Sequence, residues 1–127
     1  MNPNIAMSDS NRQSVVEILN ALLADEYVLY TKTRNYHWKV GGHASGTLAE
    51  FARHTRLKER PGVYPDAAGM LKDLLGDHES VIRRLREDLE TAAGKHKDAG
   101  TSDFLTGLME KHEKMAWMLR AFLPKGR

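Results

Sequence analysis

The chain has 127 residues, in which 19 Lys and Arg stand against 17 Asp and Glu, giving a formal net charge of only +2. This balance gives no bulk electrostatic reason to bind nucleic acid, and no apolar run approaches the roughly 18 residues that a membrane span needs. The absence of cysteine excludes disulfides and thiolate metal sites, which favours a cytoplasmic protein, and the length favours a single domain over residues 1–127.

The first predicted element follows a short tail. Residues 1–10 have neither the basic nor the apolar region of a secretion signal and are expected to form a flexible N-terminal tail. Apolar residues then recur at helical spacing from about Ser14 to Trp38, which predicts a long helix. Two capping boxes, Ser10–Gln13 and Ser14–Glu17, compete for its start, and the glycine pair at 41–42 ends it.

The rest of the chain also reads as helix. In the connector over residues 41–65, a capping box predicts a short helix at Thr47–Thr55. A second long helix is predicted from Asp66 to about Ala93, and a third begins at Thr101, which is expected to cap it, and stops at Pro124. Because no β signal appears, the predicted fold class is all-α, with three long helices and one short connector helix.

Each long helix carries an apolar stripe that predicts its buried face. The expected positions are Val15, Ile18 or Leu19, Leu22, Glu26, Leu29 and Thr33 in the first; Met70, Leu74, His78, Val81, Leu85, Leu89 and Ala92 in the second; and Phe104 or Leu105, Leu108, His112, Met115, Leu119 and Phe122 in the third.

Metal binding in a chain without cysteine depends on its six histidines and its carboxylates. His43 and His96 fall in predicted loops and His54 lies on the short helix, where solvated side chains are expected. His78 and His112 lie on apolar stripes, and we expect them to be hydrogen-bonded core residues.

His37 differs from the other histidines. Glu26, Tyr30 and Thr33 share its face of the first helix, yet a single imidazole binds metal weakly. A di-iron helical bundle is built from Glu-x-x-His pairs, and no Glu of this chain has a His three residues later.

Three blocks of the sequence resemble the Dps mini-ferritins, the DNA-binding proteins of starved cells in the ferritin superfamily. LLADEYVLYTKTRNYHWKV (Leu22–Val40) resembles their first helix, Gly41–Glu90 resembles their crossover helix and third helix, and Gly100–Leu123 resembles their last helix. The resemblance implies a ferritin-like helical bundle, here reduced to three long helices plus the connector helix.

The resemblance also implies an incomplete iron site. In the family a second helix separates the Tyr-His-Trp segment from the Gly-Gly-His loop, whereas Val40 is followed directly by Gly41 here. The missing helix would carry a second histidine and the Asp-x-x-x-Glu pair of the family's ferroxidase centre, which lies at the twofold interface between subunits. His37 matches the one ligand from the first helix, and the other three ligands have no counterpart.

Acidic residues near the start of the last helix line the iron-entry pores of the family. Asp98 and Asp103 lie in that region and are the candidate pore residues. The alternative is that they are surface acids that compensate the helix dipole.

The resemblance implies a cytoplasmic homo-oligomer, cage-like in form, that captures and oxidises Fe(II), stores it and protects DNA from oxidative stress. The residues leave the ferroxidase activity, and so the assignment as an enzyme, open. The alternative is a non-catalytic, self-assembling deletion variant, natural or engineered. A DNA-binding role ranks last, because the tails offer only Arg12, Lys125 and Arg127 for phosphate contacts, so weak or no binding is expected.

Loss of a helix would uncover apolar surface. We expect part of two apolar stripes to have no packing partner within the chain. These are the stripe around Leu22 and Leu29 on the first helix and the stripe around Leu105 and Met115 on the last. Since such patches rarely stay exposed, either a neighbouring subunit or the Thr47–Thr55 helix is expected to fill the groove.

Overall fold

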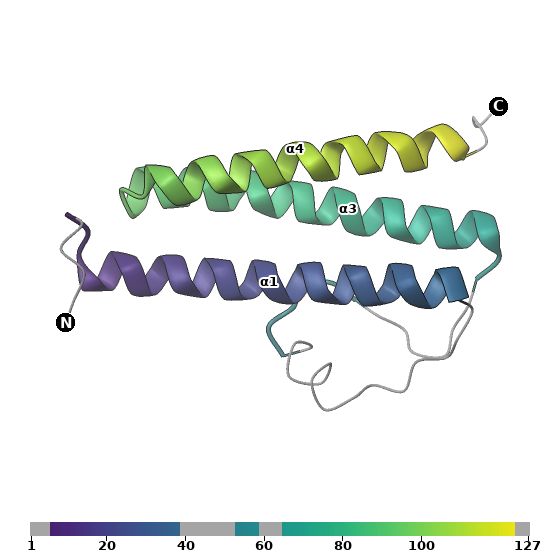
Figure 1. The fold of residues 1–127 in the computed structure, drawn as a ribbon, viewed down its shortest axis with the longest axis horizontal. Helices are drawn as coiled ribbons and strands as arrows, with labels where there is room; N and C mark the ends of the chain where they lie inside the picture. Colours follow the sequence, from purple (N-terminus) through teal and green to yellow (C-terminus); the bar gives the residue numbers. More distant parts are fainter. Residues whose placement is uncertain (1–5, 39–52, 59–64, 124–127) are drawn as a thin grey trace.

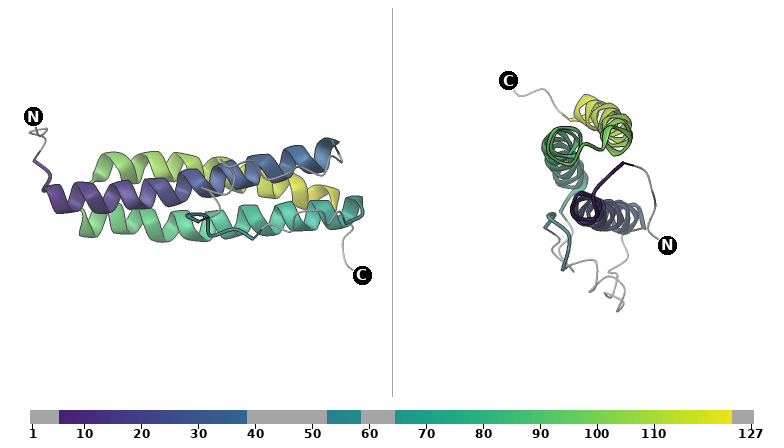
Figure 2. Two further views of the ribbon diagram at one scale, coloured as in Figure 1. Left: turned by 90° about the horizontal axis from the view of Figure 1, so that it is seen from below. Right: turned by 90° about the vertical axis from the view of Figure 1, so that its left-hand side faces the viewer.

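The computed structural model describes residues 6–38, 53–58 and 65–123. Its elements are helix α1 (Asp9–Trp38), helix α3 (Ala67–Glu90), the π-helix η1 (Thr91–Lys95) and helix α4 (Ala99–Phe122). The three long helices lie side by side, with α1 and α4 running in one direction and α3 in the other (Figure 1), and the end-on view in Figure 2 places them at the corners of a triangle. The predicted all-α bundle of three long helices is confirmed.

The predicted helix over Thr47–Thr55 lies outside the described residues up to position 52. Its last three positions, 53–55, are described and are not helical. Residues 1–5 of the predicted tail also lie outside the described part.

Helix α1 starts earlier than the sequence predicts. The hydroxyl of Ser8 accepts a hydrogen bond from the backbone N–H of Asn11 at 3.2 Å, which is the capping interaction of a helix whose first residue is Asp9. The predicted caps at Ser10 and Ser14 are therefore wrong, since both residues lie inside the helix.

The other two long helices are capped by aspartates. The side chain of Asp66 accepts from the backbone of Gly69 at 2.7 Å, so the predicted start of the second long helix is confirmed. Asp98, rather than Thr101, caps α4: its carboxylate accepts from the Thr101 backbone at 3.0 Å and from the Thr101 hydroxyl at 2.6 Å. A carboxylate three residues upstream of that N–H is the stronger acceptor, so Thr101 becomes a donor.

A single apolar core joins the three helices. Its buried members are Leu22, Leu29, Leu74, Val81, Leu85, Ala92, Leu105 and Met109. The stripe predicted for the second long helix is confirmed, since every member is buried or packs partly buried, and position 105 rather than 104 faces inward on α4.

The stripe predicted for the last helix is partly wrong. Met109 and Ala116 are buried there, whereas Met115 and Phe122 are exposed. The buried positions 105, 109, 112 and 116 follow the alternating spacing of four and three residues that keeps one seam against a neighbouring helix. The apolar residues one position earlier lie beside that seam.

The apolar surface that is left uncovered is therefore made of other residues than the sequence predicts. Leu22, Leu29 and Leu105 are covered within the trio of helices, so the prediction that their stripes face nothing is wrong for them. On α1, Thr33 is exposed although it was expected on the buried face.

Candidate functional site

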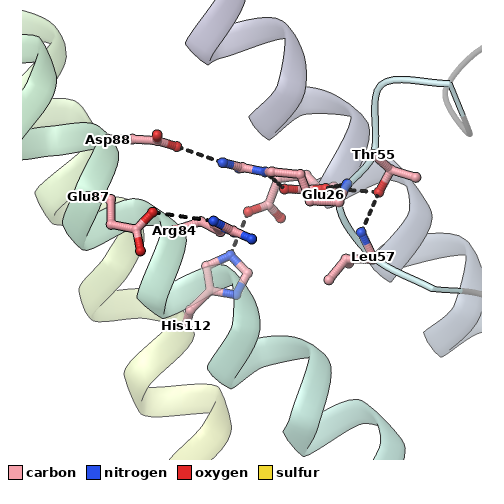
Figure 3. Close-up of polar contacts among 9 residues, drawn as sticks. Glu26, Thr55, Leu57, Arg84, Glu87, Asp88 and His112 are labelled. Carbon is pink, nitrogen blue, oxygen red and sulfur yellow. Dashed lines mark hydrogen bonds and ion pairs between the residues drawn. The ribbon is translucent and has the colours of Figure 1, made fainter.

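Three polar side chains from three helices meet in the middle of the bundle. Glu26 comes from α1, His78 from α3 and His112 from α4, and the two histidines are almost completely buried. The Nε2 atom of His112 lies 2.5 Å from Oε1 of Glu26, and its Nδ1 atom lies 2.9 Å from Nδ1 of His78. Glu26 and His112 point toward one another in Figure 3. We call these three residues the central triad.

The hydrogen-bond chemistry fixes one proton position in the central triad. A carboxylate can only accept, so Nε2–H of His112 donates to Glu26. The two Nδ1 atoms of His78 and His112 share one hydrogen bond, whose donor depends on the tautomers of the two rings. Burial, together with the nearby charge of His112, lowers the pKa of His78 from 6.5 to about 4, so His78 is neutral near pH 7.

This arrangement makes the triad a hydrogen-bonded chain rather than a ligand set. The Nδ1 atoms of the two histidines are directed at each other and are therefore engaged in one hydrogen bond. Within residues 6–38, 53–58 and 65–123, no group of three or more His, Asp or Glu side chains is placed to hold a metal ion. The expectation that His78 and His112 are hydrogen-bonded core residues is confirmed.

A second polar network fastens the segment 53–58 to the bundle. Asp25 of α1 is only 1% exposed, and its carboxylate accepts from the Thr55 hydroxyl at 2.8 Å and from the backbone N–H and Nε of Arg56 at 2.6 and 2.7 Å. Arg56 Nη1 also donates to Asp88 of α3 at 3.0 Å. Thr55 and Asp88 stand at the two ends of this network in Figure 3. The arginine therefore links α1, α3 and the connector.

A third network lies near the end of α1. Nζ of Lys32, a buried residue, is 2.7 Å from Oδ2 of Asp77 and 3.8 Å from Oδ2 of Asp73. The hydroxyl of Tyr36 donates to the same oxygen of Asp73 at 2.8 Å. Burial raises the pKa of Asp77, and the ammonium of Lys32 opposes that change. These contacts bind α1 to α3 close to the position of His37.

The predicted site residues do not come together. His37 lies in the last turn of α1, but its side chain lies outside the described part of the structure. Asp98 is the cap of α4, and its hydrogen bonds with the Thr101 side chain and backbone lower the pKa of its carboxyl group. Asp103 is exposed in the first turns of α4. The residues that the structure does bring together are those of the central triad.

The structure also differs from the sequence-based prediction at one histidine. His96, expected to be solvated in a loop, is 5% exposed, and its Nδ1 atom lies 3.4 Å from the side-chain oxygen of Asn11 on α1. The partner is 85 residues away in the chain, so no local pattern indicates it. The triad had a weak signal, because Glu26, His78 and His112 each occupy a predicted buried stripe.

Known proteins of similar sequence belong to a class of helical bundles. The family model described as a ferritin-like domain matches residues 39–127. A low temperature-induced protein of Nostoc sp. is 38% identical over 94% of this chain and 86% of its own length. DNA protection during starvation protein 2 of Bacillus anthracis is 31% identical over 89% of this chain and 98% of its own length.

Solved structures show the same architecture. DpsC from Streptomyces coelicolor matches with a TM-score of 0.86 at 20% identity, covering 100% of this chain and 93% of that chain. Dps from Staphylococcus aureus matches with a TM-score of 0.75 at 25% identity, covering 95% and 100%. The fold and these matches define a ferritin-like protein. Within that class, the chain belongs to the Dps mini-ferritin family.

Iron storage and stress protection are the general roles of this family, and iron is its usual cargo. None of the helices in the described part of the chain is long and apolar enough to cross a membrane.

Proposed function

We propose that this chain is a cytoplasmic, homo-oligomeric Dps-type protein that binds and stores iron under stress but has lost most of the family's ferroxidase centre. The observation that carries the proposal is the 31% identity, over nearly the full length of both chains, to a protein named for DNA protection during starvation. A general stress protein of Bacillus subtilis, 25% identical over 87% of this chain, supports the stress role.

The loss of the ferroxidase ligands is supported by the sequence around position 40. The alignment with the Nostoc protein extends over 153 positions although this chain has only 127 residues, so the relative contains residues with no counterpart here. We infer that such a gap falls at the direct junction of Val40 and Gly41, where the family's second helix would stand. His37 is then the single retained ligand from the first helix, and one imidazole cannot hold a pair of iron ions.

Iron entry is proposed at the start of α4. Asp98 and Asp103 remain the candidate pore residues, and they differ in their surroundings. The Asp98 carboxylate is engaged in capping the helix through Thr101, whereas Asp103 is exposed. If a pore forms between subunits here, Asp103 is the residue that would meet the passing cation.

A kinetic experiment tests the proposed loss of activity. Fe(II) and oxygen are mixed with the protein and with a His37→Ala variant, and ferric absorbance is followed by stopped flow. We expect the two traces to coincide, and a His54→Ala variant serves as a control because His54 is an exposed histidine. A fast phase that disappears only in His37→Ala would refute the proposal.

The second candidate function is that of a self-assembling protein without iron chemistry. The apolar side chains exposed on α1 and α4, among them Leu23 and Phe122, favour it because they offer surface for association. Iron retention separates the two candidates. After loading with Fe(II) and peroxide and then gel filtration, iron that elutes with the protein in excess of the subunits supports storage, and iron-free assemblies support the second candidate.

A further inference from the structure

Two rows of exposed apolar side chains run along the bundle. On α1 the row consists of Val16, Leu23 and Tyr30, and on α4 it consists of Phe104, Met115, Met118 and Phe122. These side chains are between 40% and 75% exposed, which is unusual for aromatic and large aliphatic residues in such number. We call the two rows together the α1–α4 face.

The contact between Glu26 and His112 locates the two rows on one side of the molecule. On α1, Leu23 and Tyr30 lie three residues before and four residues after Glu26, so they are displaced to one side of it. On its other side, Lys32 binds Asp77 of α3, and Asp25 binds Arg56, which in turn binds Asp88 of α3. The row of α1 thus lies to one side of the point at which Glu26 contacts His112 of α4.

On α4 the geometry mirrors that of α1. Met115 lies three residues after His112, on the side away from Glu113, which pairs with Arg86 of α3. Since α1 and α4 run in the same direction (Figure 1), both rows face away from α3. The two rows of the α1–α4 face therefore lie on the side of the molecule opposite the third helix.

The spacing of the rows is that of a helix-packing seam. Positions 16, 23 and 30 are seven residues apart, and positions 104, 108, 111, 115, 118 and 122 alternate between four and three residues. This is the repeat with which one helix packs along another. The buried positions 105, 109, 112 and 116 of α4 have the same spacing and pack within the bundle. Helix α4 therefore has the pattern of a helix that packs on two sides.

We propose that the α1–α4 face is an interface through which two copies of this chain associate, an inference that rests on the homo-oligomeric state proposed above. The aromatic residues of the face alone expose on the order of 100 Å² each, given the 150–250 Å² of a whole aromatic side chain. The complete face thus approaches the roughly 800 Å² per partner that a stable interface buries. An isologous contact between copies covers all of this surface at once.

Charge complementarity favours a second copy as the occupant. Lys111 is exposed in the α4 row, and Glu26, one third exposed, borders the α1 row. Glu26 and His112 are in contact, so Lys111 and Glu26 stand at nearly the same height along the bundle. A twofold axis parallel to the helices places α4 of one copy against α1 of the other at equal heights, which brings each Lys111 to the Glu26 of its partner.

Mass measurements test the interface. The double variant Leu23→Glu/Met115→Glu places charges on both rows without removing a core side chain, and Trp117→Glu is the matched control, because Trp117 is 66% exposed on another side of α4. Sedimentation velocity is run on all three proteins, with far-UV circular dichroism to verify the helical content. We expect the double variant to weaken association on the order of 100-fold and Trp117→Glu to leave it unchanged.

The outcomes separate this inference from the proposed function. A wild-type mass of 14.3 kDa at all concentrations would refute both the homo-oligomer and the interface. Oligomers that persist in the folded double variant would refute the interface alone. Disulfide cross-linking is a second measurement, because the chain has no cysteine of its own. A mixture of the Tyr30→Cys and Met115→Cys variants should form a mixed disulfide on oxidation. If this product does not form, the proposed axis is wrong.

Discussion

The Nδ1 atoms of His78 and His112 lie 2.9 Å apart in the centre of the bundle, and Glu26 holds the opposite nitrogen of His112. The two Nδ1 atoms can hold only one proton between them, because two N–H groups would otherwise point at each other. Stability and protonation are coupled through these rings.

The stability of the fold should decrease in mild acid. In the unfolded chain His78 takes up a proton below its ordinary pKa of 6.5, whereas in the folded chain its pKa is about 4. Its contribution is therefore complete above pH 6.5 and is lost as the pH falls from 6.5 toward 4. We expect the free energy of unfolding in urea to drop by about 2 kcal/mol between pH 7 and pH 5 from this residue.

The control for this prediction is His78→Gln, whose amide can still donate to His112 but does not titrate. Its free energy of unfolding should depend less on pH over the same interval. An equal decrease in the wild type and the variant would assign the effect to other groups.

Asp25→Asn should be strongly destabilising. It leaves Arg56, which is partly buried, opposite a neutral amide, and removal of one partner from a buried pair costs about 2–4 kcal/mol. Glu87→Gln is the matched control, because it breaks the exposed Arg84–Glu87 pair and should cost less than about 1 kcal/mol. Urea unfolding that gives equal values for the two variants would contradict the role assigned to the arginine.

Two glycines of α3 should respond in opposite ways to alanine. A Cβ at Gly76 meets nothing within 4 Å, so Gly76→Ala should raise the free energy of unfolding by about 0.8–1 kcal/mol through helix propensity. A Cβ at Gly69 would lie 2.6 Å from the Cβ of Pro65, so Gly69→Ala should be destabilising despite the same propensity gain. Thermal unfolding of the two variants measures the contrast, and changes of the same sign would contradict it.

DNA binding should be weak and strongly dependent on salt. Arg12 is not in a flexible tail: it lies in α1 and pairs with Asp9 at 2.5 Å, which reduces the cations left for phosphate contacts. Lys125 and Arg127 lie outside the described residues. Fluorescence anisotropy with a short duplex at physiological salt should show no binding at micromolar protein. Tight binding that survives deletion of residues 125–127 would show that a basic surface elsewhere is used.

The helices could be predicted because their signals are local. Apolar periodicity depends on the geometry of a single helix, and it located all three long ones. The register of α4 was harder, because Phe104 and Leu105 begin two apolar rows with the same spacing, and only packing against α3 selects the second. The start of α1 was missed because Ser8 caps it two residues ahead of the first capping box.

The polar interior could be predicted only in part. His78 and His112 were placed on buried faces, but their meeting depends on how far α3 and α4 are shifted along each other, which no single helix encodes. The Asp25–Arg56 network depends on the path of the connector, and Arg56 has no periodic signal at all. The role of His37 stays a prediction.

The order of elements along the chain bears on how the bundle opens. Helices α3 and α4 are neighbours in sequence, joined by η1 and the turn at Lys97. Helix α1 is separated from α3 by 28 positions (39–66). Several separate polar links connect α1 to the other two helices. Contacts of short sequence separation re-form fastest after a fluctuation. In deuterium, the amides of α3 and α4 should therefore exchange slowly and nearly together, while those of α1 exchange sooner, as a unit that detaches and returns.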